Sequence, residues 1–131
     1  MLESDASIEQ LEGRWPESDP DASRLIRVVH GLRRLPISAL TAEDLRILLG
    51  QREAVSAVLP RALDLIDADP LTSGDMYPGD LLVVVLRLGE AGALNSKDID
   101  RLRVAIERIR QIDDGSVVGE IWERAASLGI A

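Results

Sequence analysis

The 131-residue chain contains no cysteine, no phenylalanine, one tyrosine and only two tryptophans. Without cysteine it can form neither a disulfide framework nor a thiolate metal site, and a cysteine nucleophile is excluded. Because aromatic side chains are so few, aliphatic residues must fill the interior, as they do where helices pack through aliphatic stripes. Hydrophobic residues make up 46% of the chain, so we expect one cooperative domain over residues 1–131.

Long apolar runs are also lacking. The longest near-continuous stretch, residues 81–88, is interrupted by Arg87 and is far shorter than the ~20 residues that span a bilayer. Residues 1–21 carry seven acidic residues against one arginine, which does not resemble a signal peptide. We therefore expect a soluble cytoplasmic protein without membrane contacts, in which residues 1–22 form a loosely ordered acidic N-terminus.

Positive charge is scarce, since 15 basic residues face 23 acidic ones and the formal net charge is −8. Nucleic-acid binding depends on neutralising phosphates, so we expect no nucleic-acid partner. Residues 23–35 are nevertheless locally basic, as in the recognition helix of a helix-turn-helix regulator. Salt bridges from their arginines to acidic residues of neighbouring helices are the favoured interpretation. These arginines are Arg24, Arg27, Arg33 and Arg34.

Two helix starts carry strong capping signals. Thr41 is predicted to be an N-cap with Asp44 at the N3 position, and Asn95 is predicted to be an N-cap with Asp98 at N3. Together with hydrophobic periodicity, such signals predict about seven short helices. We place them over residues 7–12, 23–35, 41–50, 55–69, 78–89 and 97–112, with a last one after residue 116.

Three of these helices carry further expectations. Pro60 lies within residues 55–69 and should kink or split that helix. Pro78 is expected at the first helical position after the loop of residues 69–79, and Ser116 is expected to cap the last helix.

Residues 81–86, with the sequence LLVVVL, have the propensity of a β-strand. Nothing else in the chain offers a pairing strand, and a helix that is apolar all round is typical of a buried helix. We therefore predict an all-α fold, a single compact bundle of about seven short helices around this central apolar helix. The predicted core includes Leu82, Val85, Leu86, Leu102 and Ile106.

Signals for chemistry are weak. His30 is the only histidine and lies in a predicted helix without a recognisable catalytic partner, which favours a structural role. The carboxylates between Asp64 and Asp80 lack the glycine and the terminal glutamate of an EF-hand loop. A solvated acidic rim is the favoured interpretation of them, ahead of a partner-binding surface and then a metal or catalytic site. We expect no enzyme, no cofactor and no bound metal.

Several motifs follow one another in a familiar order. They are His30-Gly31-Leu32-Arg33, Pro36, residues 40–51 (LTAEDLRILLGQ), residues 69–71 (DPL) and residues 74–82 (GDMYPGDLL). This string resembles a small all-helical family of immunity proteins from bacterial contact-dependent growth inhibition systems. The resemblance covers about residues 8–90 and is strongest over 40–82, and nothing after about Leu88 adds to it.

The resemblance implies a cytoplasmic protein that binds the toxic C-terminal domain delivered by a neighbouring cell and blocks its active site or another required surface. Such toxins are frequently nucleases with basic substrate-binding surfaces, which an acidic protein suits. The family offers no catalytic residues. The alternative is an acidic helical adaptor or regulatory protein that binds another cellular protein. A toxin gene directly beside this gene would distinguish the first function from the second.

A candidate partner-binding surface follows from the charge pattern. No basic residue occurs between Arg61 and Arg87, whereas five aspartates do. A surface of one sign accelerates association with a partner of the opposite sign, and a tyrosine supplies an amphipathic anchor. We predict that the surface contains Asp67, Asp69, Asp75, Tyr77 and Asp80, with Glu43 and Asp44 adjacent. In the competing interpretation, Asp80 caps its own helix as the N3 carboxylate and Tyr77 packs locally.

Overall fold

The computed structural model describes residues 6–14 and 23–131. Within these ranges the chain forms seven α-helices and one short 3₁₀ helix, with no strand. In order they are α1 (Ile8–Glu12), α2 (Arg24–Leu32), η2 (Ile37–Ala39), α3 (Ala42–Gly50), α4 (Val55–Ala68), α5 (Asp80–Glu90), α6 (Ser96–Ile112) and α7 (Gly119–Ser127). The predicted all-α fold is confirmed. The expectation for residues 1–22 falls mostly outside the described residues.

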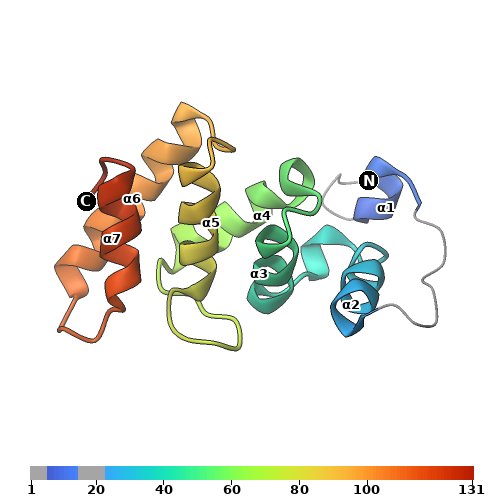
Figure 1. The fold of residues 1–131 in the computed structure, drawn as a ribbon, viewed down its shortest axis with the longest axis horizontal. Coiled ribbons are helices and arrows are strands. Elements are labelled where there is room, and N and C mark those ends of the chain that lie inside the picture. The colour runs from blue at the N-terminus through green and yellow to red at the C-terminus, as the bar shows by residue number, and fades with distance from the viewer. Residues whose placement is uncertain (1–5, 15–22) are drawn as a thin grey trace.

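The helices follow one another along the long axis of the molecule, from α1 and α2 at one end to α6 and α7 at the other (Figure 1). Helices α3, α5 and α7 pack side by side as one row, and α4 packs against α6 behind them. The loop before α5 contacts Glu43 at the start of α3 and Glu120 at the start of α7. The first turns of the three helices therefore meet at one edge, and the helices run parallel.

Local capping chemistry explains where most helices begin. Thr41 and Asp44 form a reciprocal capping box at α3, and Asn95 and Asp98 form another at α6. In each box the cap side chain accepts from an amide of the first turn, and the N3 carboxylate accepts from the cap amide. Both predicted N-caps are confirmed.

Two predicted helix starts are wrong. Helix α5 begins at Asp80 and not at Pro78, because Gly79 precedes it with a left-handed φ of 89°. Helix α7 begins at Gly119, because the Ser116 amide donates to Asp114 and residues 113–116 form a turn. Helix α4 is not split, since it continues through Pro60, which lies on an exposed side where solvent can replace the missing backbone donor.

Helix α5 lies in the middle of the molecule, between α3 and α7, and is buried on nearly all sides. Only Arg87, Gly89 and Glu90 of this helix have substantial exposure. The residues predicted for the core are completely buried, with 0% exposure each: Leu82, Val85, Leu86, Leu102 and Ile106. Burial of aliphatic surface between packed helices thus overrides the strand propensity of the sequence LLVVVL.

Ion pairs hold the N-terminal helices to the rest. The Arg33 side chain is 3% exposed, and its Nη1 lies 2.6 Å from Glu53 Oε1, while its Nη2 donates to the Gly13 carbonyl at 3.0 Å. Arg34 Nε lies 3.7 Å from Glu9. The salt-bridge interpretation is confirmed for these two arginines. The described residues contain no helix that combines the length and the apolar character needed to cross a bilayer.

Candidate partner-binding surface

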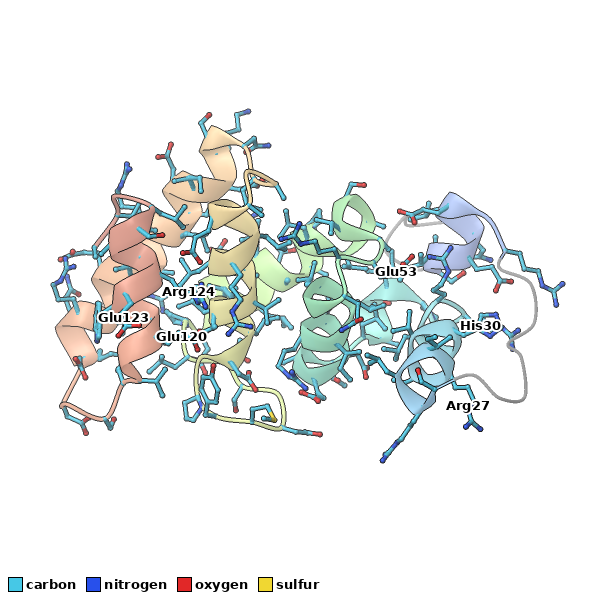
Figure 2. All side chains as sticks on the ribbon, in the orientation of Figure 1. Arg27, His30, Glu53, Glu120, Glu123 and Arg124 are labelled. Carbon is cyan, nitrogen blue, oxygen red and sulfur yellow. The ribbon has the colours of Figure 1, made fainter. Side chains whose placement is uncertain are left out.

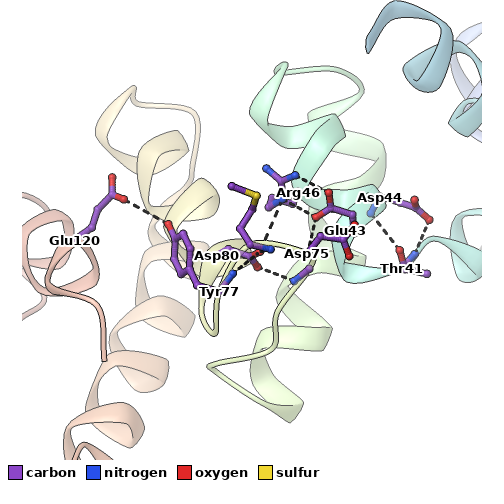
Figure 3. A network of polar contacts seen from close by, with 10 residues as sticks. Thr41, Glu43, Asp44, Arg46, Asp75, Tyr77, Asp80 and Glu120 are labelled. Carbon is purple, nitrogen blue, oxygen red and sulfur yellow. Dashed lines mark hydrogen bonds and ion pairs between the residues drawn. The ribbon is translucent and has the colours of Figure 1, made fainter. Parts of the chain in front are cut away.

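The loop of residues 69–79 is organised by Asp80, the first residue of the helix that follows it. The Asp80 carboxylate accepts hydrogen bonds from the backbone amides of Gly74 at 2.7 Å, Met76 at 3.0 Å and Tyr77 at 3.4 Å (Figure 3). Its residue exposure is only 2%. A buried carboxylate that receives several amide donors stabilises the backbone that supplies them. Asp80 therefore holds the loop in a defined shape over the start of α5.

Glu43 attaches this loop to α3. Its carboxylate accepts from Arg46 Nε at 2.7 Å, from Arg46 Nη2 at 2.6 Å and from the Asp75 amide at 2.9 Å (Figure 3). These hydrogen bonds, that from Arg46 foremost, lower the pKa of the Glu43 carboxyl. A Cβ on Gly74 would lie 2.3 Å from Glu43 Oε1 and 2.9 Å from its Cα. Only glycine permits this approach of loop and helix.

Tyr77 attaches the other side of the loop to α7. Its hydroxyl donates to Glu120 Oε1 at 3.4 Å, and Glu120 also accepts from Arg87 Nη2 and Arg124 Nε, both at 2.8 Å. Glu120 and Arg124 lie together on α7 (Figure 2). The two arginines, Arg87 first, lower the pKa of Glu120. Burial, followed by the charge of Glu120, raises the pKa of Tyr77. A continuous polar network therefore joins α3, the loop, α5 and α7.

The structure brings four of the predicted surface residues together in this network: Glu43, Asp75, Tyr77 and Asp80. They do not share one role. Asp75 is exposed, Glu43 and Tyr77 are half-buried, and Asp80 is buried. The Asp80 carboxylate cannot form part of a surface, because the loop occupies and covers it. The structure agrees better with the competing interpretation, in which Asp80 has a local structural role. Asp80 is, however, the first helical residue and not N3, and its carboxylate binds the amides of the preceding loop.

The other three predicted residues lie apart from the network centre. Asp69 is exposed, and its Oδ1 accepts from the Leu71 amide within the loop. Asp44 is partly exposed and belongs to the capping box of α3. Asp67 is exposed on α4 and is bound by Arg101 of α6 at 2.5 Å. Of the seven, Asp69 and Asp75 are thus the exposed carboxylates that no arginine contacts at ion-pair distance within the described residues.

The run of one charge sign in the sequence does not produce a surface of one sign. Arg46 and Arg101 come from outside residues 62–86 and lie against Asp80 and Asp67. Arg87, the residue that follows this run, pairs with Glu120, the acceptor of the Tyr77 hydroxyl. The surface predicted from the sequence includes none of the three. The signal for Arg46 was its position three residues after Glu43 on a predicted helix, a spacing that brings the side chains together. No short spacing pointed to Arg87, because its partner Glu120 lies 33 positions later in the chain.

Among the described residues, no three histidine, aspartate or glutamate side chains converge in a way that could hold a metal ion. The network offers paired charges and hydrogen-bonding edges, which are the elements of protein recognition.

A family model for CDI immunity proteins matches residues 9–104, most of the chain. The match runs from α1 into α6, so α7 with Glu120 and Arg124 lies beyond it. No curated protein sequence and no solved structure matches the chain.

Proposed function

The chain belongs to the CDI immunity proteins, which act against a cognate contact-dependent growth inhibition toxin, and we propose that it binds the C-terminal domain of its toxin in the cytoplasm. The observation that carries this proposal is the family match over residues 9–104. Inhibition by binding requires no chemistry from the immunity protein. One chain then protects the cell for as long as the complex persists, so slow dissociation is the property that matters.

The surface that we propose for binding is the acidic edge, defined as Asp44, Asp69 and Asp75 beside the starts of α3 and α5. Asp75 is held outward because its amide donates to Glu43, while Asp80 fixes the amides around it from inside. Asp67 lies next to this edge, although Arg101 partly neutralises it. A preorganised surface loses little conformational entropy when a partner binds.

The class of toxin that suits this edge is a nuclease. A surface that binds nucleic acid is basic, because it must neutralise phosphates. The net charge of −8 attracts such a surface over long range, and the acidic edge supplies local contacts. Occupying the nucleic-acid site would block the substrate directly. The toxin's nucleic-acid substrate should then compete with the immunity protein for binding. High salt should weaken inhibition to the extent that binding depends on these charges.

The test uses the toxin domain encoded beside the gene of this chain. Stopped-flow association is measured for the natural chain and for the variant Asp69→Lys/Asp75→Lys, which reverses the two exposed carboxylates of the edge that no arginine of the described residues contacts, over a range of salt concentrations. We expect the association rate constant to fall about 10-fold or more at low salt, with a weaker salt dependence.

The control reverses two exposed acids of α6, Asp100 and Glu107, each of which already pairs with an arginine three residues later, and it should change the rate far less. If the double variant associates at the natural rate with the natural salt dependence, the acidic edge is scaffold. If the natural chain fails to bind the toxin domain at all, the proposed function itself is wrong.

A further inference from the structure

A groove follows the seam between the parallel helices α3 and α5. Two open hollows of about 320 and 120 Å³ lie along this seam and share Val84 and Arg87 as lining residues. They are therefore parts of one feature. We define the α3–α5 groove by Arg46, Leu49, Arg52, Val83, Val84 and Arg87. Arg46 and Leu49 lie three residues apart on α3, and Arg87 lies three and four residues after Val84 and Val83 on α5, as expected for one face of each helix, while Arg52 follows the end of α3.

The groove differs from the acidic edge because arginines line most of it, although Asp80 and Glu120, each in contact with an arginine, also line the larger hollow. Valine and leucine side chains form its floor, and three guanidinium groups line it. The Arg46 guanidinium already donates its Nε and Nη2 hydrogens to the Glu43 carboxylate, so it forms an ion pair within the chain. Arg87 contacts Glu120 but its side chain remains 54% exposed. The Arg52 side chain is exposed and forms no hydrogen bond or ion pair with any residue that the structure describes.

The backbone at Arg52 supports a functional reason for this side chain. Arg52 follows the end of α3 with φ of 53°, a left-handed conformation that side chains with a Cβ disfavour. Glycine is the usual residue there. Gly50, two positions earlier, does not have positive φ, and a Cβ on it would meet no atom within 4 Å. The chain thus places an arginine where glycine is favoured, which costs stability and retains a guanidinium at the groove.

From these observations we propose that the α3–α5 groove receives a segment of the bound toxin domain. The segment presents a carboxylate side chain to Arg52 and Arg87 and an apolar side chain to Val84. This inference rests on the proposed function and deepens it. Arginines that pair with carboxylates beside an apolar floor are frequent anchors of protein interfaces. Met76, exposed by 65% at the rim, adds an adaptable apolar contact.

The negatively charged acidic edge and the positively charged groove then have different roles in binding. The acidic edge steers a basic toxin surface toward the chain, and the groove sets the orientation of the complex. A partner that matches only the acidic edge would lack the carboxylate for Arg52, so the groove discriminates between cognate and non-cognate toxins.

The decisive variant is Arg52→Gly, because it removes the guanidinium and relieves the left-handed backbone together. We expect the melting temperature to rise by about 2–4 °C, whereas the affinity for the adjacently encoded toxin domain falls by about 10-fold or more. Calorimetric titration and thermal unfolding measure the two effects. A gain in stability combined with a loss of binding is not expected of a residue with a purely structural role.

The matched control is Ala54→Gly, since Ala54 is the other residue of the same turn with positive φ, at 54°. It frees the backbone but leaves every groove side chain in place, so affinity should stay within about twofold. If Arg52→Gly binds the toxin domain like the natural chain, or if it loses stability along with binding, the inference is wrong. Saturable binding of free glutamate to the chain alone, abolished by Arg52→Gly, would assign the groove to a small anion and also overturn it. Absence of binding by the natural chain would instead reject the proposed function.

Discussion

Replacing Asp80 by asparagine tests how the loop before α5 is held. The aspartate carboxylate receives three backbone amides at 2.7, 3.0 and 3.4 Å in an environment with 2% exposure. Asparagine keeps one acceptor oxygen, but its NH₂ group must face at least one amide donor. A hydrogen bond to a charged group contributes about 1.5–3 kcal/mol, and a buried donor without a partner costs a similar amount. Because the loop can relax partly, we expect a loss of about 2–3 kcal/mol.

Urea unfolding followed by far-ultraviolet circular dichroism measures this loss directly. In thermal unfolding the same change should lower the melting temperature by about 7–12 °C for a chain of this size. Asp75→Asn is the matched control, because its exposed side chain makes no hydrogen bond within the described residues, and it should change stability by no more than about 0.5 kcal/mol. Equal stability of the two variants would show that Asp80 does not organise the loop.

Three other predictions follow from the structure. The single tyrosine, Tyr77, should titrate above its ordinary pKa of 10.0 when absorbance is followed against pH, and Glu120→Gln should lower that pKa because a neighbouring negative charge is removed. The pKa values of Glu43 and Glu120 lie below 4.5, so their ion pairs stabilise the fold above that pH and are lost as the pH falls through the folded-state pKa. Each Glu→Gln variant should therefore lose less stability on acidification than the natural chain, as urea unfolding at a series of pH values would measure. Leu82→Ala should cost about 2–5 kcal/mol in urea unfolding, since Leu82 is completely buried in α5.

Much of the fold could be predicted because its signals are local. An N-cap and its N3 partner lie three residues apart, so the boxes at Thr41 and Asn95 are visible in the sequence and recur in the structure. The burial of α5 was predictable because no polar face interrupts residues 81–86. The starts of α5 and α7 were less predictable, because Gly79 and the turn of residues 113–116 replace the expected caps.

The candidate surface could be predicted only in part. The sequence locates the loop and its acidic residues, but it does not show which carboxylates face solvent. The Asp80 carboxylate accepts hydrogen bonds from three backbone amides. Asp67 is bound by Arg101, which lies on another helix more than thirty residues later in the chain. Arg52 carries no sequence signal for its left-handed conformation, because that conformation depends on how α3 and α4 meet.

The helical class, the main caps and the identity of the buried helix follow from the amino-acid sequence, because propensity, capping and burial are properties of short segments. The charge pattern of the surface depends on how the helices pack. Packing α3, α5 and α7 in parallel brings Arg46, Arg87 and Glu120 to one acidic loop, and it opens an arginine-lined groove beside that loop. Charge interactions depend on distance in space, and stacked helices bring together residues that are far apart in the chain.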